Sequence, residues 1–165
     1  MQIKRLFKHL LTPHWRIRVA YPARSLAAIE AAIARSEKTH RGELRFAVEA
    51  DLPLAALLRG QTVRSRAAEV FSQLRVWDTE DNSGVLIYVQ LVDRRVEILA
   101  DRGIAARVPQ ADWDAVCRRM EQAFARGDFE AGTLTAIEEI GSRLARHFPS
   151  EGGGNNELPD RPVVL

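Results

Sequence analysis

Apolar positions along the chain predict three strands. Apolar and mostly charged residues alternate over 43–49, and this two-residue period predicts a strand with one buried face. Residues 85–91 are almost wholly apolar, which is typical of a central strand that is buried on both faces. The alternation resumes over 95–100, directly after a short polar reversal at 93–94, and predicts an antiparallel hairpin partner for the second strand.

Apolar residues at helical spacing predict helices around these strands, at 25–39, 62–77, 110–127 and 129–148. Because helices connect the first two strands, we expect these strands to be parallel. The order of the elements predicts an α/β fold. The predicted fold is a three-layer α/β/α sandwich, in which a small mixed sheet of two parallel strands and an antiparallel hairpin partner carries helices on both faces.

A basic amphipathic arm, residues 1–24, precedes this pattern. It holds six basic residues and no acidic one, and its first apolar residues recur at helical spacing, with the basic residues mostly on other faces. Such a helix is typical of an element that lies on a membrane surface or binds a partner. It is equally compatible with a helix that docks on the domain and keeps its charges in water. The residues expected at a membrane surface are Ile3, Lys4, Arg5, Phe7 and Lys8.

The rest of the chain has the composition of one ordinary soluble domain. The 165 residues, of which 46% are hydrophobic, suit a single domain over 25–149. The glycine-rich stretch that follows predicts a flexible C-terminal tail over 150–165. No apolar run reaches the roughly 20 residues of a membrane span, and no secretory cleavage pattern follows the basic N-terminus. The expected location is therefore the cytoplasm, with or without association with a membrane.

The distribution of charge along the chain indicates which class of partner the protein binds. The formal net charge of the chain is only +2, although the arm alone carries six basic residues. The excess of positive charge therefore belongs to the arm, and it does not form a basic surface across the domain, as in a nucleic-acid-binding fold. We expect an anionic membrane surface or a membrane protein complex as the partner, and no nucleic acid.

An acidic cluster is the main candidate for a metal site. The loop 78–83 precedes the second strand and Asp101 follows the third, so the hairpin places both at the same end. Calcium and magnesium take several oxygen ligands from carboxylates and amides, and the predicted ligands are Asp78, Asp81, Asn82 and Asp101. A solvated loop followed by helix N-terminal acids explains the same residues without a metal. Because the spacing matches no EF-hand loop, any Ca²⁺ or Mg²⁺ site here is expected to be weak.

Histidine and cysteine form no catalytic constellation in the sequence. The histidines, His9, His14, His40 and His147, lie near the ends of predicted elements and have no metal or triad spacing, so we expect them at the surface. Cys117 falls inside a predicted amphipathic helix and is expected to be a small buried apolar residue.

Four short segments, in their order along the chain, resemble the TPM domain. They are Trp77, the strand entry Asn82-Ser83-Gly84-Val85-Leu86-Ile87, the hairpin Asp93-Arg94-Arg95-Val96-Glu97-Ile98, and the helix junction 124–132. The resemblance covers residues 25–148. It implies an α/β/α sandwich. Members of that family are described as calcium-binding proteins, as acid phosphatases, or as modules that help to maintain or assemble membrane protein complexes.

The chain departs from the family pattern in two respects. Many members carry a signal peptide and a C-terminal transmembrane helix, and this sequence has neither pattern. A Glu and an Asp that commonly follow the third strand are replaced by Ala105 and Gln110. If those carboxylates bind a metal elsewhere in the family, the resemblance implies that this chain has lost them.

Two functions are compatible with these observations. We favour a non-catalytic interaction module that associates peripherally with a membrane or a membrane protein complex and binds a divalent cation weakly. The alternative is a metal-dependent acid phosphatase, which needs an activated water or a nucleophile beside converging carboxylates and a cationic group for the phosphate. The absence of the two family carboxylates favours the module.

Overall fold

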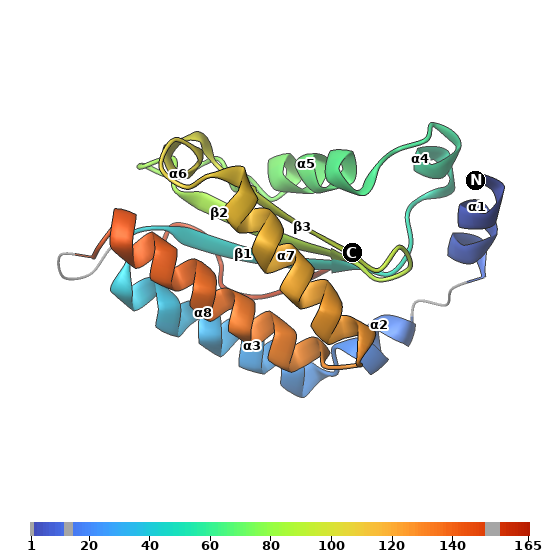
Figure 1. The fold of residues 1–165 in the computed structure, drawn as a ribbon, viewed down its shortest axis with the longest axis horizontal. Coiled ribbons are helices and arrows are strands. Elements are labelled where there is room, and N and C mark those ends of the chain that lie inside the picture. Colours follow the sequence, from blue (N-terminus) through green and yellow to red (C-terminus); the bar gives the residue numbers. More distant parts are fainter. Residues whose placement is uncertain (1, 12–14, 151–155) are drawn as a thin grey trace.

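The computed structural model describes residues 2–11, 15–150 and 156–165, and for residues 2–4 the backbone alone. Figure 1 shows the arrangement of the elements. In chain order they are α1 (Gln2–Leu10), α2 (Trp15–Ala20), α3 (Ala23–Ser36), the 3₁₀ turn η1 (Glu37–Thr39), β1 (Glu43–Glu49), α4 (Leu54–Leu58), α5 (Val63–Gln73), β2 (Gly84–Gln90), β3 (Arg95–Ala100), α6 (Arg102–Ala105), α7 (Gln110–Ala125), α8 (Phe129–His147) and β4 (Val163–Val164).

A mixed sheet of four strands, in the order β3-β2-β1-β4, organises the fold. β1 and β2 run parallel in the register that places Leu44 opposite Val85, whereas β2 and β3 form the antiparallel hairpin. These pairings confirm the predicted parallel pair and its hairpin partner. β4 is a strand that the pattern did not predict, and it runs parallel to β1.

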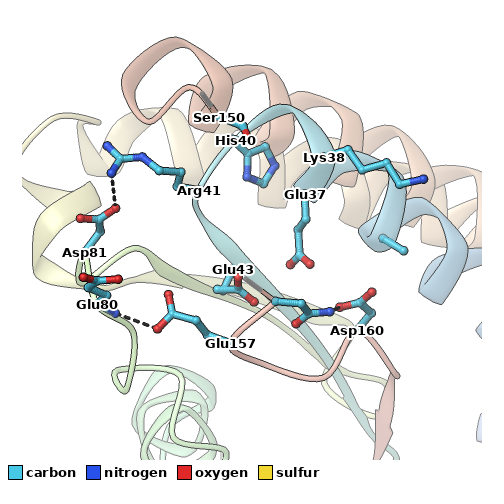
Figure 2. Close-up of a pocket in the computed structure, with 12 residues that line it drawn as sticks. Glu37, Lys38, His40, Arg41, Glu43, Glu80, Asp81, Ser150, Glu157 and Asp160 are labelled. Carbon is cyan, nitrogen blue, oxygen red and sulfur yellow. Dashed lines mark hydrogen bonds and ion pairs between the residues drawn. The ribbon is translucent and has the colours of Figure 1, made fainter. Parts of the chain in front are cut away.

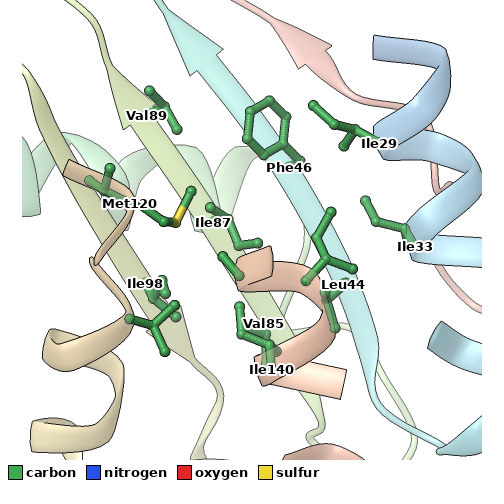
Figure 3. Packing of buried hydrophobic residues seen from close by; sticks show 14 of the residues in the cluster. Ile29, Ile33, Leu44, Phe46, Val85, Ile87, Val89, Ile98, Met120 and Ile140 are labelled. Atoms are coloured by element: carbon green, nitrogen blue, oxygen red, sulfur yellow. The ribbon is translucent and has the colours of Figure 1, made fainter. Parts of the chain in front are cut away.

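Helices cover both faces of the sheet. α3, α7 and α8 pack on one face, and the main core lies between them and the strands. Figure 3 shows the branched aliphatic side chains that fill this core, among them Ile33, Ile87 and Ile140. α5 covers the opposite face, where the buried Leu158 also packs. The predicted three-layer α/β/α sandwich is confirmed. Among the residues that the structure places, no helix has both the length and the apolar composition that crossing a membrane requires.

β1 is buried on both faces, whereas the alternation of apolar and charged residues predicted only one buried face. Its charged residues Glu43, Arg45 and Glu49 are only 4%, 6% and 4% exposed. Glu49 accepts hydrogen bonds from Arg66, at 2.8 and 3.0 Å, and from Tyr88. The charged face is covered because α5 and the C-terminal residues lie over it. Neither covering segment could be inferred from the pattern within β1.

The end of the chain packs on the domain, which corrects the expectation of a flexible tail over 150–165. Val163 and Val164 pair with β1, and Leu158 is buried in the cluster on the α5 face. The burial of Leu158 removes apolar surface from water that a flexible tail would leave exposed. The glycine-rich part of the predicted tail, residues 151–155, lies outside the described residues.

Candidate functional site

The loop 78–83 and the start of α6 meet at one end of the β2–β3 hairpin. The N–H of Gly103 donates to the carbonyl oxygen of Asn82 at 3.0 Å. A Cβ atom at Gly103 would lie 2.5 Å from the carbonyl oxygen of Asp81, so this close approach of two backbones requires glycine. The acidic loop and Asp101, the N-cap of α6, are therefore neighbours.

Asp78 and Asp81, two of the predicted metal ligands, each pair with an arginine. Asp78 Oδ2 lies 2.8 Å from Arg75 Nη2, and Asp81 Oδ2 lies 3.0 Å from Arg41 Nη1. Both pairs are well exposed to solvent, and exposed pairs contribute about 0–1 kcal/mol to stability. A cation could therefore replace either arginine at a small cost in stability.

Asn82 and Asp101, the other two predicted ligands, both contact Arg102. Asn82 Oδ1 accepts a hydrogen bond from Arg102 Nε at 2.9 Å, and Asp101 Oδ1 accepts from the N–H of Arg102 at 2.7 Å. The second oxygen of Asp101, Oδ2, is buried without a hydrogen-bond partner. Within residues 2–11, 15–150 and 156–165, no three His, Cys, Asp or Glu side chains are grouped so that they could hold a metal ion. The predicted metal site stays a prediction that requires these side chains to rearrange.

A pocket of about 440 Å³ opens beside this loop, and acidic residues dominate its lining. Figure 2 shows them reaching the pocket from η1, from the start of β1, from the loop and from the C-terminal residues. The acidic lining residues are Glu37, Glu43, Glu80, Asp81, Glu157 and Asp160. Sequence reasoning found only the carboxylates of the loop, because the other segments are far apart along the chain.

Glu37 is the most perturbed carboxyl group of the pocket. Its pKa is raised to about 9, first by burial and then by the negative charges of Glu43 and Asp160, and against the lowering effect of the Leu44 N–H, which donates to Glu37 Oε1 at 2.8 Å. Burial also raises the pKa of Glu43. Glu37 therefore keeps its proton at neutral pH, and the pocket is less negative than its six acidic residues suggest.

Two histidines that we expected at the surface are buried. His40 is 2% exposed and its Nε2 lies 2.9 Å from Ser36 Oγ. Burial lowers the pKa of His40 to about 4, so the ring is neutral near pH 7. His9 is 1% exposed, and its Nδ1 accepts the N–H of Leu52 at 2.9 Å. The prediction was wrong because distant segments cover both rings, as the bridge between His40 and Pro149 illustrates.

α1 is docked on the domain through polar contacts. Arg5 forms a bidentate pair with Asp93, in which Nη2 lies 2.6 Å from Oδ2 and Nε lies 3.2 Å from Oδ1. Arg5 Nη1 also donates to the carbonyl oxygen of Gln61 at 2.8 Å. His9 Nε2 lies 3.2 Å from Asp93 Oδ1. The carboxylate at the β2–β3 turn thus receives two side chains of the N-terminal helix.

The docked helix leaves apolar side chains in solvent. Phe7, Leu10 and Leu11 are 60%, 60% and 79% exposed. α1 contacts α4, on which Leu54 and Leu58 are 49% and 68% exposed. We call these five residues the apolar end of the molecule.

The predicted membrane-surface residues have different positions in the structure. Phe7 belongs to the apolar end, Lys8 beside it is exposed, and Arg5 is engaged by Asp93. The side chains of Ile3 and Lys4 lie outside the described part of the chain.

Comparisons with known proteins agree with this architecture. The sequence model of the TPM domain matches residues 22–143. The NMR structure of the BA42 protein from the psychrophilic bacterium Bizionia argentinensis is similar with a TM-score of 0.76 and 32% identity, covering 87% of this chain and 94% of that one. The solution NMR structure of the N-terminal domain of a protein from P. gingivalis shares the fold, with a TM-score of 0.54 and 16% identity over 82% of this chain and 92% of that one. No curated protein sequence matches the chain. The family match spans β1, β2 and β3 with the helices that connect them, and the chain belongs to the TPM domain family.

Proposed function

We propose that this TPM domain protein is a non-catalytic interaction module that associates peripherally with an anionic membrane surface through the apolar end. One observation carries the proposal: five large apolar side chains are exposed on α1, on the residue that follows it, and on α4, and the two helices contact each other. Single exposed apolar side chains are normal in soluble proteins. Several of them gathered at one end of a molecule are typical of an interaction surface.

The way in which α1 docks supports this proposal. A helix that only stabilises a domain is expected to bury its apolar stripe against the core. α1 instead buries His9 and directs Arg5 to Asp93, while Phe7 and Leu10 are exposed. Polar docking of this kind fixes the helix on the domain and leaves its apolar side chains available for a lipid interface.

Positive charge on the same part of the chain favours an anionic surface. Residues 1–24 hold six basic residues and no acidic one. On α2, Arg16 and Arg18 are exposed together with the apolar Trp15 and Val19. Each Lys or Arg near an anionic leaflet contributes on the order of 1 kcal/mol to binding. An anionic bilayer therefore matches both the apolar and the basic character of the arm, whereas a zwitterionic bilayer matches only the first.

Weak binding of a divalent cation is a second part of the proposal. Asp81, one of the four predicted ligands, also lines the pocket that gathers six acidic residues, and a cation that bound Asp81 would have to displace Arg41 from it. Ca²⁺ or Mg²⁺ would draw its oxygen ligands from the four predicted residues of this end. The metal-dependent phosphatase remains the alternative function. Ala105 and Gln110, at the positions of two family carboxylates, give it less support.

Co-sedimentation with liposomes tests the membrane proposal. The full chain should pellet with vesicles that contain phosphatidylserine, and less so at high salt, because salt screens exposed charges. The double variant Leu54→Ser and Leu58→Ser should bind at least about tenfold more weakly, since burying one leucine contributes about 1.5–3 kcal/mol. Trp77→Ser is the matched control, because Trp77 is 47% exposed beyond the far end of α5. Equal pelleting of the double variant and the parent would end the proposal.

A further inference from the structure

The outer edge of β1 is occupied by residues from outside the family match. The match ends at residue 143, and within it β1 has β2 as its strand neighbour. The neighbour on the other side is β4, at Val163–Val164. An edge strand offers its unpaired N–H and C=O groups to any extended segment. Here the segment 156–165 of the same chain takes a position that the matched domain leaves open.

The segment 156–165 is held by a small set of backbone contacts. β4 pairs with Ala47 and Val48, two of the seven residues of β1. The N–H of Leu165 donates to the carbonyl oxygen of Val48 at 3.0 Å, and the N–H of Leu158 donates to Glu43 Oε2 at 3.0 Å. The bond of Leu165 is a backbone bond to the edge strand, as in extended peptides that add to a sheet edge, whereas the bond of Leu158 goes to a side chain of that strand.

Apolar side chains of the segment anchor it between the sheet and α5. Leu158 is buried in the cluster that includes Val70 and Tyr88, and Val163 and Leu165 pack partly buried against the same cluster. Backbone pairing combined with a few side-chain pockets is the arrangement by which sheet edges recognise extended ligands. The segment therefore contacts the domain as a bound peptide would.

β1 carries a positive charge beneath the segment, on Arg45, that the segment does not fully pair. Arg45 of β1 is 6% exposed, and its Nε and Nη1 atoms have no hydrogen-bond partner. Asp160 of the segment is close enough to favour the charged guanidinium, but its carboxylate does not bond those two nitrogens. Leaving a buried donor unpaired is unfavourable. An occupant with a better-placed carboxylate would therefore bind more tightly than the segment does.

We propose that the outer edge of β1 and the adjoining α5 form a peptide-binding groove, in which the segment 156–165 occupies the place of an extended peptide from another protein. The ligand runs parallel to β1 and carries a leucine at the position of Leu158. Two positions later it carries an acidic residue that pairs with Arg45, and aliphatic residues follow at five and seven positions after the leucine. This inference goes beyond the membrane proposal and is independent of it, because the apolar end is built from α1 and α4.

The occupant is expected to be another protein, and not a second copy of this chain. A segment attached through a short connection has an effective concentration in the millimolar range. The same segment from a second copy offers identical contacts, so it cannot compete at micromolar concentration. A peptide whose carboxylate pairs with Arg45 gains an interaction that the chain's own segment lacks, and this gain favours displacement.

The test uses the full chain with residues 151–155 replaced by a protease recognition sequence and cut after folding. Fluorescence anisotropy then measures binding of a labelled peptide with the sequence of residues 156–165, in excess over the released segment. Binding to the cut chain should be at least about tenfold tighter than to the uncut chain, because the competing segment 156–165 is no longer tethered to the domain. A peptide with Asp160→Glu, whose carboxylate reaches further, should bind more tightly, and a peptide with Leu158→Asp should not bind.

The Arg45→Met variant of the cut chain tests whether the chain recognises the acidic residue of the peptide through Arg45 or binds the peptide non-specifically. In this variant the advantage of the Asp160→Glu peptide over the parent peptide should disappear. Three results would overturn the proposal. They are a loss of the folded circular dichroism signal when the connection is cut, no binding of the peptide by the folded cut chain, and a dimer of the uncut chain at micromolar concentration by sedimentation. The first two would make the segment a fixed part of the fold, and the third would make a second copy the occupant.

Discussion

Replacement of Asp93 by asparagine tests how α1 is held on the domain. Arg5 and His9 converge on this carboxylate at 2.6 and 3.2 Å. The Asp93 side chain is 13% exposed, so solvent screens the interaction poorly. Asparagine keeps the size of aspartate and one acceptor oxygen but removes the negative charge. We therefore expect Asp93→Asn to fold normally and to hold α1 less tightly.

The expected loss is about 2 kcal/mol of docking free energy, because hydrogen bonds to charged groups contribute about 1.5–3 kcal/mol and Arg5 keeps its bond to Gln61. Burial alone would raise the pKa of Asp93, but the hydrogen bonds from Arg5 and the nearby His9 ring hold it below its usual value of 3.8. A carboxyl group with a lowered folded pKa stabilises the folded state above its unfolded pKa, and this contribution is lost as the pH falls through the folded value. In the parent, the contribution of the Asp93 carboxylate to the docking of α1 should therefore be lost as the pH falls below its usual value of 3.8.

Hydrogen exchange of the amides in the second half of α1 measures this directly. A loss of 2 kcal/mol corresponds to a roughly 30-fold lower protection in α1, whereas protection in β2 should not change. Asp78→Asn is the matched control, because its pair with Arg75 is exposed and remote from α1. Unchanged protection of α1 in Asp93→Asn would refute the view that these polar contacts hold the helix.

Three further predictions concern the pocket and the loop. Glu37 has a pKa raised from 4.5 to about 9, so the folded chain keeps a proton that the unfolded chain loses, and the parent loses up to about 1.4 kcal/mol of stability per pH unit over this range. The free energy of unfolding, measured with urea at pH 5 and pH 8, should fall less between these values in Glu37→Gln than in the parent. Equal losses in the two proteins would contradict the raised pKa of Glu37. Millimolar Ca²⁺ should shift the amide NMR signals of 78–83 and 101–103. Shifts confined to the β2–β3 turn around Asp93 would show that the cation does not bind at the predicted site. Generic phosphomonoesters should not be hydrolysed, and metal-dependent turnover that disappears in Asp81→Ala would establish the phosphatase alternative.

Local periodicity predicts most of this fold. The apolar run at 85–91 predicted a doubly buried strand, which is β2, and the helical spacing placed α7 and α8 close to their observed bounds. β1 was misjudged because charged residues are seldom buried, so Glu43 and Arg45 indicated a solvent face. Their burial depends on a C-terminal segment more than 100 residues later in the chain. β4 has only two residues and leaves no periodic signal of its own.

The candidate sites were predictable only where their residues are neighbours in the sequence. The loop 78–83 is visible as a run of acidic residues, but Glu37 and Asp160 join it only through the fold. The docking of α1 depends on Arg5 and Asp93, which are 88 residues apart. Charge alone does not select one partner for an arginine among 22 acidic residues. Amphipathicity predicted the helix correctly and could not indicate which of its sides would meet the domain.

The acidic pocket and the apolar end lie at opposite ends of β1. Glu43, the first residue of β1, lines the pocket. Leu52, just after the last residue of β1, donates its N–H to His9 of α1. A strand of seven residues with a rise of about 3.3 Å per residue spans roughly 20 Å. This separation exceeds the Debye length of about 8 Å at physiological ionic strength, so the pocket should not repel an anionic surface that meets α1.

Two substitutions of equal charge magnitude test this separation. Lys8→Gln removes one positive charge on α1, and Glu157→Gln removes one negative charge of the pocket while keeping an oxygen for the N–H of Glu80. Lys8→Gln should weaken co-sedimentation with phosphatidylserine vesicles by several-fold, since a basic residue near the leaflet contributes about 1 kcal/mol. Glu157→Gln should leave co-sedimentation unchanged at physiological ionic strength. If Glu157→Gln strengthens binding as much as Lys8→Gln weakens it, the net charge of the molecule controls association, and the apolar end is not the membrane-binding surface.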